Sequence, residues 1–261
     1  MKTLKQSPLD PAFVQNPYPF YETARSLGPF FHWAEYNMAC TGNAAAVSAI
    51  FRDRRFGREA PAELAPKIPA HLKPFYAVEA HSMLELEPPR HTRLRGLVLR
   101  AFTSRRIAAL QPEIEVLTHQ LIDAFPAGPF DLLAQFGQKL PVIIIARLLG
   151  VPESMSDDLL KWSNAMVGMY MAGPADPSAR RAREDRAIAA TESFVAFMRG
   201  YVEARRQDPR DDLITSLIAA EEAGEKLTTD ELITTCILLL NAGHEATVHT
   251  IGNGVKTLLE T

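Results

Sequence analysis

Residues 227–261 limit the possible folds more than any other part of the chain, because they form one continuous helical pattern without a proline. Thr228 followed by Glu231 fits a capping box, in which a hydroxyl and a carboxylate each accept a backbone N–H at the helix start. At 1.5 Å per residue this helix is roughly 50 Å long, enough to cross a whole domain. Its segment Cys236–Leu240 is apolar on every side, so we expect it to be buried on all faces.

Polar and helix-weakening residues interrupt this apolar helix near its middle. Asn241, His244 and Glu245 follow the apolar segment, and Gly243 costs a helix about 1 kcal/mol relative to alanine. Departures from an otherwise consistent pattern are expected at functional sites. Burying a carboxylate is costly unless it has a partner, so a buried Glu245 is expected to have a task.

Small side chains share one face of the same segment, at spacings of three and four residues: Ala242, Gly243, Ala246, Thr247 and Thr250. So flat a face suits a wide, flat ligand lying close to the backbone. It equally suits close packing of another helix through Gly243 and Thr247, and the spacing alone leaves both interpretations open. The neighbouring acid and amide favour a ligand.

The composition is that of an ordinary globular protein, with 261 residues of which 47% are hydrophobic and 23% are charged. A net charge of −3 argues against a nucleic-acid partner. No apolar run is long enough to span a membrane, and none follows Met1 as in a signal peptide, so we expect a cytoplasmic protein. Cys40 and Cys236 fit neither a disulfide framework nor a zinc spacing.

The rest of the chain reads as mostly helical, with a small β element near the N-terminus. Residues 1–17 hold three prolines and predict an irregular arm, before a helix and two short strands. Residues 53–87 predict a long proline-rich loop, which in a compact domain is usually functional. The charged helix at residues 178–206 is expected to be exposed.

A second candidate site lies at the start of the helix that follows Pro88-Pro89. His91 and Arg95 are four residues apart on one face, in turns where free N–H groups already favour an anion. They predict a site for a carboxylate or phosphate of a ligand. The alternative is a solvated basic face paired with the glutamates just before the prolines.

Histidines in the long helix do not predict a metal site. His244 and His249 are five residues apart, about 140° around the helix at 100° per residue, so they cannot easily share one ion. We expect no metal bound directly by this chain's side chains.

Together the two helices resemble a known pair. Residues 87–95, Glu-Pro-Pro-Arg-His-Thr-Arg-Leu-Arg, followed by Ala-Phe-Thr at 101–103, closely resemble the C helix of bacterial cytochromes P450. Residues 239–247, Leu-Leu-Asn-Ala-Gly-His-Glu-Ala-Thr, resemble their I helix. The helix order between them and Asn-Pro-Tyr-Pro at 16–19 also fit, so the resemblance covers essentially the whole chain.

The resemblance implies haem as the cofactor. His91 and Arg95 would hold the haem propionates, and the distal face of the porphyrin would lie against Ala242, Gly243 and Ala246. The loop over residues 53–87 and the methionine-rich helix at 154–171 would form the walls of a pocket for a small apolar substrate. The implied reaction inserts one oxygen atom from O₂, with electrons from a ferredoxin-type partner.

One departure from the family concerns proton delivery. Glu245 would be the acid of the I-helix pair, but the next position, usually threonine, is Ala246. Thr247 or an ordered water would have to supply the hydroxyl. The side chains at 246 and 247 point about 100° apart, so Thr247 is not a simple replacement.

A second departure concerns the haem ligand. The family's Glu-x-x-Arg helix and its cysteine loop would follow the I helix, and the pattern Phe-x-x-Gly-x-x-x-Cys-x-Gly does not occur in these residues. Cys40 precedes Thr41-Gly42 without the upstream residues, and Cys236 lies inside the helix. The axial thiolate drives O–O cleavage, so we expect the chain to be catalytically incompetent by itself.

We therefore expect an incomplete P450-like domain over residues 1–261. Its parts are an N-terminal helix and β element (1–52), a loop region (53–87), a helical section (88–226) and the long helix (227–261). A non-catalytic helical binding or structural module without haem is the alternative. In either case the Cys236–Leu240 face would be partly uncovered, which predicts self-association or weak stability.

Overall fold

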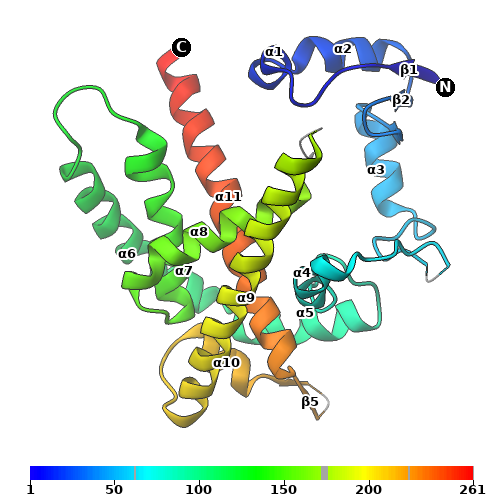
Figure 1. Ribbon diagram of the computed structural model, residues 1–261. Coiled ribbons are helices and arrows are strands. Elements are labelled where there is room, and N and C mark those ends of the chain that lie inside the picture. The colour runs from blue at the N-terminus through cyan, green and yellow to red at the C-terminus, as the bar shows by residue number, and fades with distance from the viewer. Residues whose placement is uncertain (62, 172–175, 223, 261) are drawn as a thin grey trace. The chain divides into compact units, whose positions relative to one another are not determined.

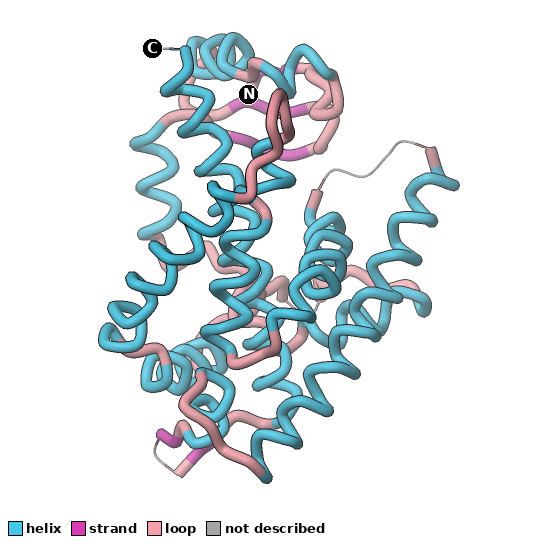
Figure 2. Tube along the Cα trace, turned by 90° about the vertical axis from the view of Figure 1, so that its left-hand side faces the viewer, coloured by secondary structure: helices cyan, strands magenta, loops and turns pink. Residues whose placement is uncertain are grey.

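The computed structural model describes residues 1–61, 63–171, 176–222 and 224–260. These residues form two compact units, Met1–Ala60 and Pro61–Thr261, each of which is described by itself. The first unit combines short helices with a small sheet, and helices make up most of the second (Figures 1 and 2). The mainly helical fold with a small N-terminal β element is therefore confirmed, while the expectation of one domain over all residues stays a prediction.

The first unit is built on a three-stranded sheet in the order β1-β2-β3. β1 pairs parallel with β2 from Lys2 opposite Phe31, and β2 pairs antiparallel with β3. The prediction of an irregular arm over residues 1–17 is wrong, because this arm contains β1 and a short helix. The elements of the unit are β1 (Lys2–Leu4), α1 (Pro11–Gln15), α2 (Tyr18–Ser26), β2 (Phe31–Trp33), β3 (Met38–Cys40) and α3 (Ala44–Arg52).

Aromatic side chains hold the first unit together. The rings of Phe20 and Trp33 are 4.7 Å apart between centroids, and Phe13 meets both edge-on. Phe31 is buried beneath them. Such ring pairs stabilise a small core beyond the area that they bury.

The second unit is almost entirely helical, and α11 contacts α4, α7, α8, α9 and α10 within it (Figure 1). Its elements are η1 (Ala70–Leu72), α4 (Lys73–Glu79), α5 (Arg90–Ala101), α6 (Ser104–Asp123), η2 (Leu133–Gly137), α7 (Lys139–Leu149), η3 (Glu153–Met155), α8 (Ser156–Val167), η4 (Gly168–Tyr170), α9 (Pro177–Gln207), α10 (Leu213–Ala219), β4 (Glu221–Glu222), β5 (Glu225–Lys226) and α11 (Thr229–Glu260).

The start of α11 has the predicted capping box. The Thr228 hydroxyl accepts the Glu231 N–H at 3.2 Å, and the Glu231 carboxylate accepts the Thr228 N–H at 2.9 Å. Two backbone donors that a helix start leaves without partners are thereby satisfied. The long helix predicted from the sequence is confirmed.

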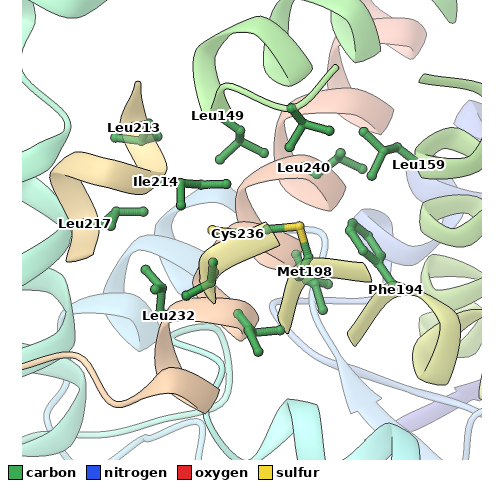
Figure 3. Close-up of a cluster of buried hydrophobic side chains, with 14 of the residues drawn as sticks. Leu149, Leu159, Phe194, Met198, Leu213, Ile214, Leu217, Leu232, Cys236 and Leu240 are labelled. Atoms are coloured by element: carbon green, nitrogen blue, oxygen red, sulfur yellow. The ribbon is translucent and has the colours of Figure 1, made fainter. Parts of the chain in front are cut away.

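The core of the second unit lies where α7, α8, α9 and α10 meet α11. Leu149, Phe194, Met198 and Leu240 are each no more than 1% exposed, and Figure 3 shows them converging on Cys236. Because α9 buries the apolar face that carries Phe194 and Met198, the prediction of an exposed charged helix at 178–206 is wrong for that face.

The apolar segment of α11 is mostly covered. Cys236, Ile237 and Leu240 are at most 2% exposed, while Leu238 and Leu239 are half-buried. The face is thus partly uncovered, and self-association through it stays a prediction. No described helix combines the length and the apolar character needed to cross a membrane.

Candidate functional site

The polar and small residues in the middle of α11 separate onto two faces. Asn241 and His244 are buried, at 8% and 3% exposure. Ala242, Ala246 and Thr247 are exposed. The small side chains thus form an accessible face, while the buried polar groups lie on the side that packs into the protein.

Two hydroxyl groups of the small-residue face bond back to their own helix. Thr247 donates to the carbonyl of Gly243 and Thr250 donates to the carbonyl of Ala246, both at 2.8 Å. This four-residue pattern is common for threonine inside helices. In this rotamer the Thr247 hydroxyl donates its hydrogen bond to the backbone of its own helix. The side chain would have to rotate before the hydroxyl could donate to a ligand.

Gly243 differs from the two alanines because it faces a neighbouring helix. A Cβ added at Gly243 would lie 2.8 Å from Cδ1 of Ile145 on α7, closer than side chains normally approach. The interpretation of close helix packing therefore applies at Gly243. Ala242 and Ala246 remain accessible, so the face divides between packing and an open surface.

Glu245 is less buried than the sequence suggests, because its side chain retains 33% of its exposure. Its carboxylate Oε1 lies 3.8 Å from Nε2 of His249, which is mostly exposed. The prediction of a buried acid at this position is only partly correct, because the Glu245 side chain is half-buried. The acid lies at the edge of the protein interior, within reach of an exposed imidazole.

His244 is the deeply buried ionisable group of this segment. Burial lowers the pKa of His244, and the carbonyl of Gln138 only partly opposes this effect. The imidazole is therefore neutral at pH 7. Within the described residues no cluster of three metal-ligating side chains includes it or any other histidine.

His91 and Arg95 lie in the opening turns of α5, as the sequence predicts. His91 is half-buried and Arg95 is exposed, and neither side chain has a hydrogen bond or ion pair with the described residues. The apolar face of α5, with Leu94 and Leu97 fully buried, anchors the helix behind them. Among the described residues neither side chain pairs with the preceding glutamates, so both remain available to an anion.

Arg93 lies between these two residues and is not among the site residues that the sequence predicts. Its guanidinium forms an ion pair with Glu231 and lies 3.3 Å from Glu225. Burial alone would raise the pKa of Glu231, but hydrogen bonds from Thr228 and Arg93 lower it below its usual value. This ion pair joins α5 to the first turn of α11. The sequence signal for it was the charge of Glu231, the capping-box carboxylate, which needs a cationic partner when it is buried.

A cavity of about 180 Å³ lies against the middle of α11. It brings Ala242 and Glu245 together with the predicted loop region and with the end of α8. Tyr170 donates a hydrogen bond to Glu79 at 2.8 Å in its wall. The lining residues are Val78, Glu79, Ser82, Leu84, Val167, Tyr170, Thr234, Ile237, Leu238, Asn241, Ala242 and Glu245.

A second cavity, of about 320 Å³, lies between α4, α9 and the start of α11. Val78 and Thr234 line both cavities, and the Thr234 hydroxyl donates to the Val78 carbonyl at 3.3 Å. The Arg199–Asp230 ion pair lies in the wall of the larger cavity. This hydrogen bond joins α4 to α11 in the part of the wall that the two cavities share.

These features define a mainly helical protein whose central helix presents Ala242 and an acid to a cavity. Another helix carries a histidine and an arginine whose side chains have no partner among the described residues. A model of the cytochrome P450 family matches residues 15–261. The chain belongs to the cytochrome P450 family.

Curated relatives support this assignment. The putative cytochrome P450 133B1 of Xylella fastidiosa (strain 9a5c) is 35% identical over 253 residues, covering 95% of this chain and 61% of the relative. The vitamin D(3) 25-hydroxylase of Pseudonocardia autotrophica is 35% identical over 255 residues, covering 95% and 59%. The chain therefore spans less than two thirds of the length of these relatives.

Solved structures show the same fold. P450BioI, in complex with an acyl carrier protein ligated to hexadec-9Z-enoic acid, superposes with a TM-score of 0.84 at 29% identity, covering 95% of this chain and 63% of that structure. Epothilone B-bound cytochrome P450epoK gives 0.84 at 27% identity, covering 98% and 64%.

Proposed function

We propose that this chain forms the distal wall, the propionate contacts and part of the substrate pocket of a haem-thiolate monooxygenase. The observation that carries the proposal is the 180 Å³ cavity, because Ala242 and Glu245 of α11 line it together with the loop region before α5. Membership of the family supports the reaction class, the insertion of one oxygen atom from O₂ into a small apolar molecule.

The residues of this chain fit haem in two respects. His91 and Arg95 have no side-chain partners among the described residues and could hold carboxylates. The accessible Ala242 and Ala246 leave room for a flat ring, whereas Gly243 contributes by letting α7 pack closely. When bound through a thiolate, haem supplies the oxygen-activating chemistry.

The chain's own contribution to proton transfer is centred on Glu245. Its partly exposed carboxylate can exchange protons with solvent, and the imidazole of His249 is close enough to assist. Ala246 has no hydroxyl, and Thr247 bonds to the Gly243 carbonyl. We assign proton delivery to Glu245, with Thr247 contributing only after its side chain rotates.

The thiolate ligand is assigned outside these residues. Cys236 is fully buried, and burial raises the pKa of its thiol to about 12, which opposes formation of a thiolate. By itself the chain would then bind substrate, and bind haem weakly, without completing the reaction. A ferredoxin-type electron donor and a cytoplasmic location belong to the same proposal.

Titration of the purified chain with haem tests the proposal. We expect a Soret band that saturates at one haem per chain, and a carbon monoxide difference spectrum of the reduced complex without the thiolate-type band. The absence of haem uptake would favour the alternative, a non-catalytic helical module. A thiolate-type band would overturn the assignment of the axial ligand outside the chain.

A further inference from the structure

Asn241 is a buried amide in the wall of the 180 Å³ cavity. It is 8% exposed, and its carbonyl oxygen has no hydrogen-bond partner within the described residues. Burying an amide without a partner costs free energy, and a leucine would fill the same volume without that cost. An unsatisfied amide beside a cavity therefore indicates a group that binds a ligand.

The surroundings of Asn241 are mainly apolar. Val78, Val167, Ile237 and Leu238 line the same cavity. Ser82 also lines the cavity, and its hydroxyl accepts the Leu84 N–H at 3.3 Å, which ties it to the backbone. A ligand here would bury an apolar skeleton against these side chains and meet the amide at α11.

We infer that Asn241 determines specificity and that the cavity takes a compact apolar molecule carrying one hydroxyl group. The hydroxyl can donate its hydrogen bond to the carbonyl oxygen of Asn241, whereas a ketone has no donor and would leave that oxygen without a partner. This inference rests on the proposed function for its reaction, but ligand binding can be measured without haem.

The position of Asn241 also orients the ligand. Asn241 and Glu245 are one helical turn apart and both line the cavity, next to Ala242. The oxygen function is held at this part of α11, and the apolar skeleton extends toward Val78 and Val167. The cavity should then bind an analogue without the oxygen less tightly, because that analogue leaves the amide of Asn241 unsatisfied.

Calorimetric titration of the full chain with two matched probes tests the inference. Cyclooctanol and methylcyclooctane have nearly the same shape, but only the alcohol donates a hydrogen bond. We expect the native chain to bind the alcohol about five- to tenfold more tightly, as one hydrogen bond requires. Asn241→Leu should bring the two affinities together.

Leu238→Ala is the matched control, because Leu238 lies on the same helix and lines the same cavity without a polar group. It should weaken the binding of both probes while the preference for the alcohol persists. Asn241→Ala provides a second test should the leucine fit poorly, and it should also abolish the preference. Thermal melting establishes that each variant is folded.

The inference is overturned by equal binding of the two probes to the native chain, by an alcohol preference that survives in both Asn241 variants, or by no binding of either probe. Haem uptake is measured separately. A chain that takes up haem but shows no alcohol preference contradicts only the role of Asn241, and a chain with the preference but no haem uptake contradicts only the proposed function.

Discussion

Arg93 on α5 forms an ion pair with Glu231 in the first turn of α11, although 138 residues separate them in the sequence. The Glu231 side chain is 7% exposed and that of Arg93 is 28% exposed. The pair therefore joins the helix that carries His91 and Arg95 to the helix that carries the small-residue face. We regard Arg93 as a positioning residue for the proposed haem site.

Arg93→Ala should destabilise the chain by about 2–3 kcal/mol, because it leaves the buried Glu231 carboxylate without its cationic partner. Urea denaturation followed by circular dichroism measures this change. Arg95→Ala is the matched control on the same helix, and its effect should stay within about 0.5 kcal/mol, because the guanidinium has no described partner. Equal losses in the two variants would contradict the special role of Arg93.

The stability contributed by Glu231 should depend on pH in the acidic range. Its pKa in the folded chain lies below the usual value of 4.5, so the folded state favours the ionised carboxylate. This contribution is fully present above about pH 4.5 and is lost as the pH falls through the folded-state pKa. The unfolding free energy of Glu231→Gln, measured from pH 3 to 7, should show a flatter acid decline than that of the native chain. If the unfolding free energies of the two proteins changed in parallel with pH, Glu231 would not contribute to the acid dependence.

His91→Ala and Arg95→Ala should each weaken haem binding about tenfold or more, because each removes a charge-assisted hydrogen bond to an anionic group. Equilibrium Soret titrations give the dissociation constants. Lys161→Ala, which removes an exposed charge on α8, serves as the control and should leave haem affinity unchanged. Haem affinity that is the same in all three variants would remove His91 and Arg95 from the site.

Gly243→Ala should destabilise the native chain by about 1 kcal/mol, since its Cβ would lie 2.8 Å from Cδ1 of Ile145. Ile145→Val removes that methyl group. In this background, Gly243→Ala should become neutral or stabilise the chain by up to about 1 kcal/mol, through its better helix propensity. A double-mutant cycle by thermal denaturation measures the coupling. Additive effects would show that the two positions do not meet.

Short-range patterns determine the features that the sequence predicts correctly. The capping box at Thr228 and Glu231 involves residues three apart, and α11 continues through hydrogen bonds between residues four apart. The spacing of His91 and Arg95 follows from the same geometry. These interactions depend on neighbours along the chain, so the sequence is sufficient to locate the helices and both candidate faces.

Contacts between distant residues decided the rest. β1 needs β2, whose first residue is 29 positions away, and the burial of α9 depends on the helices packed against it. Whether Gly243 faces a ligand or α7 depends on where Ile145 lies, and the partner of Arg93 comes from another helix. A helical period shows which residues share a face. Only tertiary packing determines what that face meets, because many distant segments of similar polarity could cover it equally well.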